Sequence, residues 1–293
     1  MSMRIFLFGA GYSALAFARL AGNEAQSIAG TTRGESKFGA LRGAGIEPFA
    51  FDGTPVSPEI AAALARATHI VVSAGPSDAG DPVIAAARDL LVGATPKLRW
   101  IGYLSTVGVY GNHDGAWIDE TADCRPRPGR SDHRLEAEKE WSDLARERGV
   151  PLAILRLAGI YGPGRNALVN LENGTARRIV KPGQIFNRIH VDDIAGSLLH
   201  LARSAAGGVF NVTDDEPAPP QDVVAYAANL MGVAPPPEID FDTADLTPMA
   251  RSFYGENKRV SNAKLKATSY RFVHPNYRAA LTAMWEKGNW RRD

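Results

Sequence analysis

The sequence predicts an α/β fold, a doubly wound parallel sheet with a smaller C-terminal lobe. Short apolar runs alternate with helical patterns through the first 162 residues, and this regularity weakens afterwards, where Pro and Gly mark loops. Strands that alternate with helices at such a spacing form parallel sheets that helices cover on both faces. The chain has 293 residues, 45% of them apolar, and can therefore bury a full core.

The expected strands are apolar runs bounded by turn residues. They are Arg4–Phe8, Gln26–Thr32, Glu47–Asp52, His69–Gly75, Arg99–Thr106 and Pro151–Gly162. Helical patterns separate them, and the last of these begins near Asp132, a candidate N-cap, and ends at Gly149, a candidate C′ glycine.

We expect two lobes. The nucleotide-binding lobe comprises residues 1–162 together with 188–212, and the smaller, discontinuous lobe comprises residues 163–187 and 213–293. The proline-rich stretches in the second half punctuate helices and do not form a long linker.

Composition narrows the class of protein. The net charge of +1 gives no argument for a nucleic-acid or membrane partner, so we expect a small-molecule substrate. The single cysteine, Cys124, excludes an internal disulfide and suits a reducing cytoplasm. The apolar N-terminal stretch is interrupted by Gly9 and Gly11, which is unlike a signal peptide, and no run reaches the length of about 20 residues that a membrane span needs.

A glycine loop follows the first expected strand. Gly9, Gly11 and Ala14 form a G-x-G-x-x-A pattern at the start of a helix, with Tyr12 and Ser13 between them. Gly9 permits a tight turn, Gly11 lets the backbone approach a pyrophosphate, and Ala14 keeps the helix close to the strand. The pattern predicts a Rossmann-type dinucleotide site; an ordinary tight turn is the alternative.

The end of the second strand bears on the choice of cofactor. An NAD site usually has an Asp or Glu there for the ribose 2′-hydroxyl, but this chain has Thr31, Thr32 and Arg33. Hydroxyls and a guanidinium suit a 2′-phosphate, so we expect NADP, with NAD as the alternative. Asp52 is expected to bind the adenine amino group or to cap a turn. The cofactor is expected to cross the sheet edge at Ser73, Ala74 and Gly75.

Six later stretches resemble, in order, landmarks of the extended short-chain dehydrogenases/reductases, the superfamily of sugar-nucleotide epimerases and dehydratases. They are YLSTVGVYG (Tyr103–Gly111), WIDE (Trp117–Glu120), LRLAGIYGPG (Leu155–Gly164), RIHVDDIAGSLLHL (Arg188–Leu201), VFNVTDDE (Val209–Glu216) and NKRVSNAKLK (Asn257–Lys266). The resemblance covers nearly the whole chain and implies a Rossmann-type fold, a nicotinamide cofactor and a C-terminal substrate lobe.

The resemblance also implies residue roles. A Ser or Thr five residues before the V-Y-G glycine orients the substrate, and here that residue is Thr106. The two positions of the catalytic Tyr-x-x-x-Lys pair fall on Arg130 and Arg134. A guanidinium, with a pKa above about 12, accepts no proton, so Arg130 cannot act as the base, whereas Arg134 keeps the charge that binds ribose hydroxyls. The stretch Gly129–Glu138 is similar to an atypical branch that lacks the tyrosine.

The proton carrier is therefore open. His133 is the nominee, because it lies three residues after Arg130 and imidazole titrates near neutral pH; an exposed helix histidine is the alternative. Other candidates are His113 and the pair Tyr254 and Lys258, which repeats the dyad spacing.

No metal site is expected. The resemblance makes His190 and Asp193 part of a structural landmark, with Asp193 near a helix start. Arg156 is expected to form a structural ion pair. Trp141 and Leu144 are expected in a core or an interface.

Two functions remain. The first is an NADP-dependent oxidoreductase or epimerase-like enzyme that acts on a hydroxyl or carbonyl of a polar substrate, for which a sugar nucleotide is one candidate. Its active site would contain Thr106, Arg134 and His133. The second is a non-catalytic NADP-binding sensor or scaffold. The helices after the fourth and fifth strands suggest a homodimer, and no part of the sequence names the substrate.

Overall fold

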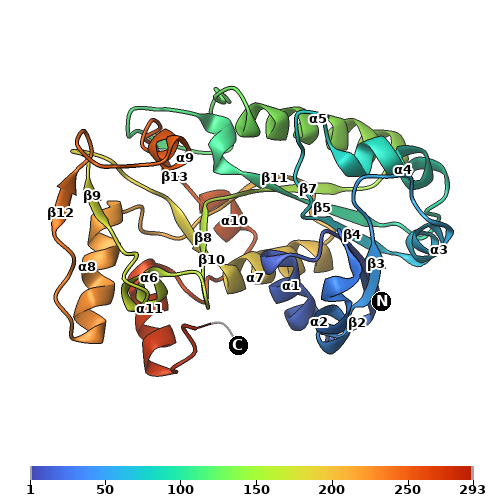
Figure 1. The fold of residues 1–293 in the computed structure, drawn as a ribbon. Helices are drawn as coiled ribbons and strands as arrows, with labels where there is room; N and C mark the ends of the chain where they lie inside the picture. The colour runs from blue at the N-terminus through green and yellow to red at the C-terminus, as the bar shows by residue number, and fades with distance from the viewer. Residues whose placement is uncertain (1, 292–293) are drawn as a thin grey trace. The chain divides into compact units, whose positions relative to one another are not determined.

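The computed structural model describes residues 2–291 (Figure 1). The chain forms two compact units: unit 1 comprises Met1–Val109, Pro126–Arg156 and Ile194–Phe210, and unit 2 comprises Tyr110–Arg125, Leu157–Asp193 and Asn211–Asp293. Residues 110–125, 157–162 and 188–193 thus join unit 2 rather than the nucleotide-binding lobe, as do residues 211 and 212. Short strands in these three segments pair inside unit 2, which explains the difference.

Unit 1 carries most of the regular structure. Its elements are β1 (Met3–Phe8), α1 (Tyr12–Ala21), β2 (Ala25–Thr32), the 3-10 helix η1 (Glu35–Lys37), α2 (Phe38–Gly43), β3 (Glu47–Ala50), α3 (Pro58–Arg66), β4 (His69–Val72), α4 (Pro82–Gly93), β5 (Trp100–Thr106), α5 (Arg130–Arg148) and most of η2 (Val107–Tyr110), β7 (Leu152–Leu157), α7 (Val191–Arg203) and β11 (Gly208–Val212).

A seven-stranded parallel sheet forms the centre of the fold, in the order β11-β7-β5-β4-β1-β2-β3. The order reverses direction at β1 and β4, and ligands of such sheets bind at the carboxyl ends of the strands beside this point. The predicted α/β fold with a doubly wound, Rossmann-type parallel sheet is confirmed.

Helices cover both faces of this sheet (Figure 1). α3, α4 and α5 share one hydrophobic core with the strands, in which Leu64, Leu91 and Trp141 are buried against Phe8 and Tyr103. Figure 1 shows α1, α2 and α7 on the opposite face. Burial on both faces explains why Ile5–Phe8 of β1 and Ile70–Val72 of β4 are continuously apolar.

Unit 2 is built from short elements. They are β6 (Trp117–Ile118), β8 (Gly159–Tyr161), α6 (Ala167–Glu172), β9 (Arg178–Val180), β10 (Arg188–His190), α8 (Pro220–Met231), β12 (Glu238–Asp240), α9 (Pro248–Phe253), β13 (Arg259–Val260), α10 (Ala263–Ala267) and α11 (Tyr277–Glu286). The strands pair two by two, all parallel: β8 with β10, β9 with β12 and β6 with β13. Helices α6, α8 and α11 enclose a separate core.

Several element boundaries differ from the predicted ones. α5 begins at Arg130, after Gly129 with φ 107°, so Asp132 lies in the first turn and is not the N-cap. Gly149 ends this helix with φ 70°, as predicted. The expected strand Pro151–Gly162 is divided into β7 and β8, because β8 pairs with β10 in unit 2. Within residues 2–291, no helix has both the length and the apolar character of a membrane span.

Candidate cofactor and active site

The glycine loop adopts the geometry that its pattern predicts. Gly9 has φ 85°, and a Cβ at this residue would lie 2.9 Å from the backbone N of Ala74, so only glycine fits there without a shift. Gly9 N donates to Thr31 Oγ1 at 2.9 Å, which holds the loop against β2. Ala14 is completely buried, as close packing of helix and strand requires.

The N-terminus of α1 is open to a ligand. Gly11 occupies the N-cap position, where no side chain caps the helix, and a Cβ on Gly11 would meet no atom within 4 Å. The backbone N–H groups of Tyr12 and Ser13 begin this ten-residue helix. Unsatisfied helix N–H groups and the helix dipole favour an anion, and the open face of Gly11 gives it room. The residues present therefore fit a pyrophosphate.

The carboxyl end of β2 presents one hydroxyl fewer than expected. Thr31 is buried, and its hydroxyl is used by Gly9 N and the Leu7 carbonyl, so this side chain is part of the loop's support. Thr32 ends β2 half-buried, and Arg33 follows it fully exposed. Arg33 forms no hydrogen bond or ion pair within the described part of the chain, so its guanidinium is available to a ligand.

The loops after β3 and β4 complete this edge of the sheet. Asp52 is exposed, and its Oδ1 accepts from Thr54 N at 3.1 Å; the hydrogen bonds of Thr54 lower the pKa of Asp52. Asp52 therefore caps a turn through Oδ1, which was one of its two expected roles. Ser73 N and Ala74 N both donate to the Phe8 carbonyl, which places Ser73, Ala74 and Gly75 next to the end of β1.

Thr106 ends β5, and its Oγ1 accepts from Gly108 N at 3.1 Å. A second hydroxyl, which the sequence reasoning missed, lies close to it. The Oγ atoms of Ser131 and Thr106 are 2.9 and 3.3 Å from the point where Gly108 would carry a Cβ. The first turn of α5 therefore contributes Ser131 beside Thr106, and the absence of a Cβ at Gly108 makes this approach feasible.

Arg134 lies where the resemblance places it, at the carboxyl ends of β4 and β5. Its Nη1 donates to the Leu104 carbonyl at 2.6 Å, and its guanidinium carbon stands 5.7 Å from the centre of the Tyr103 ring. Its Nη2 is 2.9 Å from the position of a Cβ on Gly75. Arg130, four residues earlier, is exposed at the first position of α5.

His133 turns toward the loop after β4. Its Nδ1 is 3.6 Å from Oδ1 of Asp78, and its side chain is 24% exposed. The ring is therefore half-buried and lies beside a carboxylate. Its catalytic role stays a prediction.

A buried ion pair holds the middle of α5. Arg156 on β7 donates to both carboxylate oxygens of Glu138, with Nη2 2.7 Å from Oε2, and the two side chains are only 7% and 5% exposed. Ser105, beside Thr106, donates to the same carboxylate. The predicted structural ion pair of Arg156 is confirmed, and Trp141 and Leu144 are fully buried in the core, as expected.

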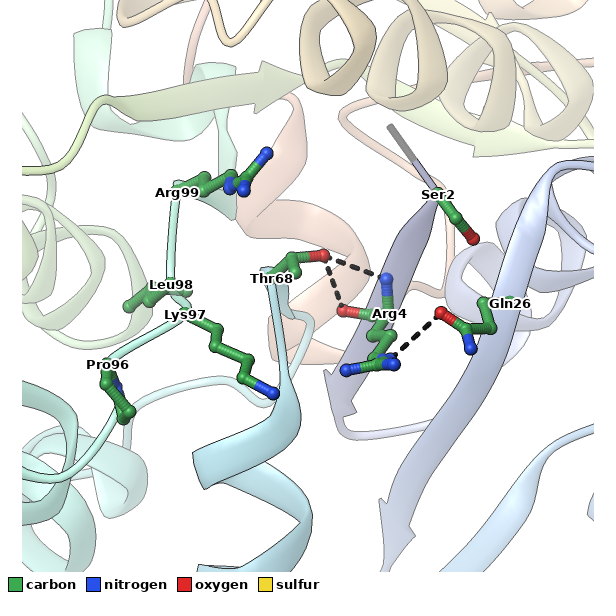
Figure 2. A pocket seen from close by; sticks show the side chains of 8 residues that line it. All are labelled: Ser2, Arg4, Gln26, Thr68, Pro96, Lys97, Leu98 and Arg99. Atoms are coloured by element: carbon green, nitrogen blue, oxygen red, sulfur yellow. Dashed lines mark hydrogen bonds between the residues drawn. The ribbon is translucent and has the colours of Figure 1, made fainter.

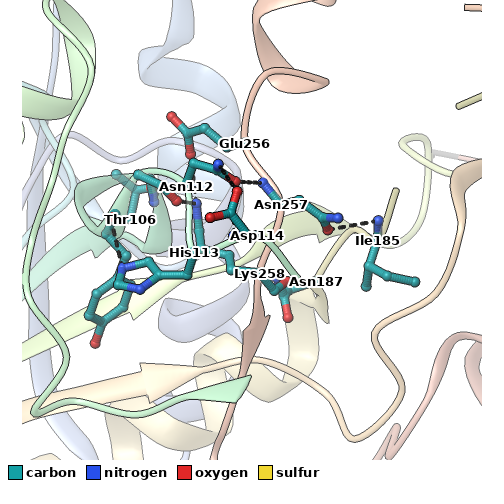
Figure 3. A network of polar contacts seen from close by, with 12 residues as sticks. Thr106, Asn112, His113, Asp114, Ile185, Asn187, Glu256, Asn257 and Lys258 are labelled. Carbon is teal, nitrogen blue, oxygen red and sulfur yellow. Dashed lines mark hydrogen bonds and ion pairs between the residues drawn. The ribbon is translucent and has the colours of Figure 1, made fainter. Parts of the chain in front are cut away.

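In unit 2, His113 belongs to a network of polar loop contacts (Figure 3). Its Nε2 lies 3.1 Å from the Tyr110 carbonyl and 3.2 Å from the Asp123 carbonyl, so Nε2 carries a proton that it donates to backbone. In the same network Asn257 N donates to Asn112 Oδ1 at 2.8 Å. This arrangement favours a loop-fixing role for His113 over proton transfer to a substrate.

Tyr254 and Lys258 also have structural surroundings. Lys258 Nζ donates to the Gly111 carbonyl at 2.7 Å and to Glu256 Oε2 at 2.6 Å. The Tyr254 ring packs against Phe186 and Phe241, with centroids 5.1 and 5.0 Å away. The dyad spacing in this segment is therefore explained by packing.

His190, Asp192 and His274 bring possible metal-ligating atoms within 4.8 Å of one another. However, His190 Nδ1 accepts from Asp192 N at 3.2 Å, and this bond occupies the lone pair that a metal would need. Burial, helped by the neighbouring His274, lowers the pKa of His190 to about 4. The arrangement suits a buried neutral imidazole.

Asp193, the other landmark residue of this stretch, is completely buried in the first turn of α7. Its Oδ1 accepts from the Tyr270 hydroxyl at 3.0 Å and from Val273 N at 2.7 Å, and its Oδ2 accepts from His274 N at 2.9 Å. The carboxylate thus fixes the segment before α11, as its predicted structural role requires.

A basic hollow of about 430 Å³ lies at the opposite edge of the central sheet (Figure 2). Arg4 at the start of β1, Thr68 before β4 and Arg99 before β5 line it together with Lys97. Arg4 Nε donates to Gln26 Oε1 at 3.0 Å. Because dinucleotides bind at the carboxyl ends of parallel strands, this amino-terminal hollow is not the cofactor site.

Comparison with known proteins shows which sequences and structures this chain resembles. No protein-family model matches the chain. The solved structure of a conserved protein of unknown function from Silicibacter pomeroyi aligns with this chain at a TM-score of 0.91. The two sequences are 46% identical, and the alignment covers 98% of this chain and 100% of that one. A proposed NAD-dependent epimerase/dehydratase from Methylobacillus flagellatus is 26% identical, with a TM-score of 0.70, over 98% of this chain and 99% of that one.

One curated relative has a named reaction. A 3-diazoavenalumate denitrifying reductase from Streptomyces is 28% identical over 174 residues, which are 53% of this chain and 54% of that protein. The match thus spans about half the length of the reductase. Together with the sheet order, the glycine loop and the placement of Thr106 and Arg134, these similarities identify the family. The chain belongs to the extended short-chain dehydrogenases/reductases, the superfamily of NAD-dependent epimerases and dehydratases.

Proposed function

We propose that this protein binds NADP and transfers a hydride to or from a polar carbonyl, hydroxyl or similar group. One observation carries the proposal: the open N-terminus of α1 and the unpartnered guanidinium of Arg33 lie at the carboxyl ends of neighbouring strands. The first suits a pyrophosphate and the second a ribose 2′-phosphate.

The end of β2 supports NADP over NAD. An NAD site would offer a carboxylate to the ribose 2′-hydroxyl, and the positions here hold Thr32 and Arg33. A carboxylate would repel a 2′-phosphate, whereas a guanidinium makes charge-assisted hydrogen bonds with it. Arg134, held by the Leu104 carbonyl, would bind the nicotinamide ribose.

A nicotinamide dinucleotide supplies or accepts the hydride. The protein's part is to orient the reacting group and to stabilise charge that develops on it. Since Thr106 Oγ1 accepts from Gly108 N, the hydroxyl proton of Thr106 is directed elsewhere and can be donated to a substrate oxygen or nitrogen. Ser131 would add a second donor beside it.

The reductive direction suits this site best. Oxidation of an alcohol needs a base to take its proton, and Arg130 cannot do so. Reduction needs only a proton donor, which water or His133 could provide. The similarity to a named reductase, at 28% identity, supports the same direction.

A fluorescence titration with NADPH and with NADH at equal ionic strength tests the cofactor site. We expect NADPH to bind at least about tenfold more tightly, and Arg33→Gln to weaken NADPH binding about tenfold or more while changing NADH binding less than about twofold. Arg19→Gln, on the exposed side of α1, is the matched control. Equal affinity for the two cofactors would contradict the assignment of NADP.

A non-catalytic NADP-binding sensor or scaffold is the second candidate. The observation that favours it is Arg130, which occupies the position of the general base on α5. NADPH consumption on a panel of carbonyl, hydroxyl and diazo compounds separates the two functions. Tight cofactor binding without hydride transfer on any of them would favour the sensor.

A further inference from the structure

Unit 2 contains a pocket of about 390 Å³, and none of the residues that line it belongs to the candidate cofactor site. Helices α6, α8 and α11 and the strands β8 and β10 form its walls. Among the described residues that line it, none is acidic and two are arginines, Arg165 and Arg188, while Tyr161 and Tyr277 contribute phenol rings.

Arg188 is held rigidly in this pocket. Its Nη1 donates to the carbonyls of Phe186 and Ala218, both at 3.0 Å, and its guanidinium carbon lies 6.0 Å from the centre of the Tyr277 ring. Two backbone acceptors fix the plane of the guanidinium. A ligand would therefore meet an arginine that has already lost its side-chain freedom, which lowers the cost of binding.

The other edge of the guanidinium is free. Nε and Nη2 of Arg188 donate to no residue of the described chain, and neither is a fully buried atom. These two N–H groups form the fork that binds a carboxylate or phosphate through two parallel hydrogen bonds. Burial lowers the pKa of Arg188 from its very high ordinary value, and the group still keeps its charge.

Two hydroxyls of the same pocket also lack acceptors. The Oη atoms of Tyr161 and Tyr277 are buried without a hydrogen-bond partner in the described chain. A buried hydroxyl without a partner has lost its hydrogen bonds to water, so each is a donor for which an acceptor is missing. Because these Oη atoms have almost no accessible surface, an oxyanion in the pocket would meet the guanidinium of Arg188 and not the phenol oxygens.

The charge of Arg188 is only partly balanced by the protein. Asp214 is the acidic group that acts on it most, yet no carboxylate of the described residues lies within the 4.0 Å of a salt bridge. Burial raises the pKa of Asp214 to about 8, which diminishes its negative charge at neutral pH. One Asp214 oxygen, Oδ2, is itself buried without a partner.

We propose that Arg188 binds an oxyanion group of the substrate, a carboxylate or a phosphate, in this pocket of unit 2. That the bound molecule is a substrate rests on the proposed function. Binding of the oxyanion itself needs neither the cofactor nor turnover. The inference narrows the proposed ligand to a small molecule that carries a carboxylate or a phosphate.

Isothermal titration calorimetry of the full chain tests the proposal. The probes are sodium malonate and sodium phosphate, each against sodium chloride at matched ionic strength; malonate reports a carboxylate site and phosphate a phosphoryl site. We expect saturable binding of one probe per chain, weakened at least about tenfold by Arg188→Gln and unchanged within about twofold by Arg146→Gln, a surface control.

Two further variants keep the test decisive if Arg188→Gln fails to fold. Arg188→Lys keeps the charge and loses the fork, so we expect it to weaken binding about fivefold or more. Asp214→Asn keeps an acceptor for Glu216 N and removes the opposing carboxyl, so we expect it to tighten binding about threefold or more at about pH 9, where the wild-type carboxyl is ionised. Absence of saturable binding of both probes, or affinities that none of these variants changes, would overturn the proposal.

The NADPH titration on the same samples separates the oxyanion site from the proposed NADP-dependent function. Binding of NADPH without either probe would remove the oxyanion site and leave the proposed function standing. Binding of a probe without NADPH would do the reverse.

Discussion

At the scale of single residues, the hydroxyls at the end of β5 decide how much chemistry the site can perform. Thr106 Oγ1 receives the N–H of Gly108, so its own proton is available, and Ser131 presents a second hydroxyl to the same space. Alcohol side chains do not act as bases at neutral pH, but they donate well to an oxygen or nitrogen that gains negative charge.

This geometry predicts a specific defect for Thr106→Ala. We expect kcat/KM on a substrate found in the reductase panel to fall about 10²–10³-fold, because one donor to the developing charge is lost. The Kd of NADPH should change less than about twofold, and Thr106→Ser should restore most of the activity, since it returns the hydroxyl. Undiminished turnover in Thr106→Ala would remove this residue from the mechanism.

Individual site residues differ in how far the sequence could predict them. Gly9 and Ala14 were predictable because each has a steric reason, and Gly11 because the pattern requires open space beside the helix N-terminus, which the structure shows. Thr31 looked equivalent to Thr32, but only the fold shows that its hydroxyl supports Gly9. Ser131 was missed because nothing in its local pattern indicates that Gly108 leaves room for it.

At the scale of elements, α5 is the helix that positions the active site, and one buried ion pair fastens it. Glu138 accepts hydrogen bonds from Nε and Nη2 of Arg156 on β7 and from the hydroxyl of Ser105 on β5. Trp141, one turn later, donates to Asp81 Oδ2 at 3.0 Å, and Asp81 Oδ1 caps α4. These contacts join α5 to two strands and to the neighbouring helix.

Removing one partner of the ion pair should be costly. Glu138→Gln leaves the buried Arg156 charge without its carboxylate, and we expect a loss of about 3–5 kcal/mol in the free energy of unfolding. Urea denaturation followed by circular dichroism measures it. Arg146→Gln, which breaks only the surface pair with Asp143, should stay within about 0.5 kcal/mol of the wild type.

A double variant sharpens this test. Glu138→Leu combined with Arg156→Met replaces the pair by apolar groups of similar volume, which often restores stability. We expect the double variant to be more stable than Glu138→Gln. If Glu138→Gln is as stable as the surface control, the pair does not fasten α5.

The central strands β1, β4 and β5 were predictable because they are buried on both faces and contain long apolar runs. The strands of unit 2 have two or three residues each, so no periodicity marks them, and they exist only through partners distant in sequence, as β8 does with β10. The start of α5 was misplaced because Gly129, which has φ 107°, replaces a side-chain cap.

At the scale of the whole molecule, the stability of the chain is linked to pH through a buried imidazole of unit 2. The pKa of His190 is lowered to about 4 by burial and by His274, whereas an exposed histidine titrates near about 6.5. Between these two values the unfolded chain binds more protons than the folded one. Stability contributed by neutral His190 is therefore present above about pH 6.5 and is lost as pH falls toward 4.

We expect this loss to amount to about 1–3 kcal/mol between pH 7 and pH 4.5. Asp214 acts in the opposite direction, since its raised pKa of about 8 makes the folded state bind a proton there, so total stability alone does not isolate His190. The comparison with His190→Asn does, because asparagine keeps an acceptor for Asp192 N and does not titrate. Urea midpoints of the two proteins at both pH values measure the difference: His190→Asn should lose less stability on acidification than the wild type, and equal losses would show that this imidazole takes up no proton on unfolding.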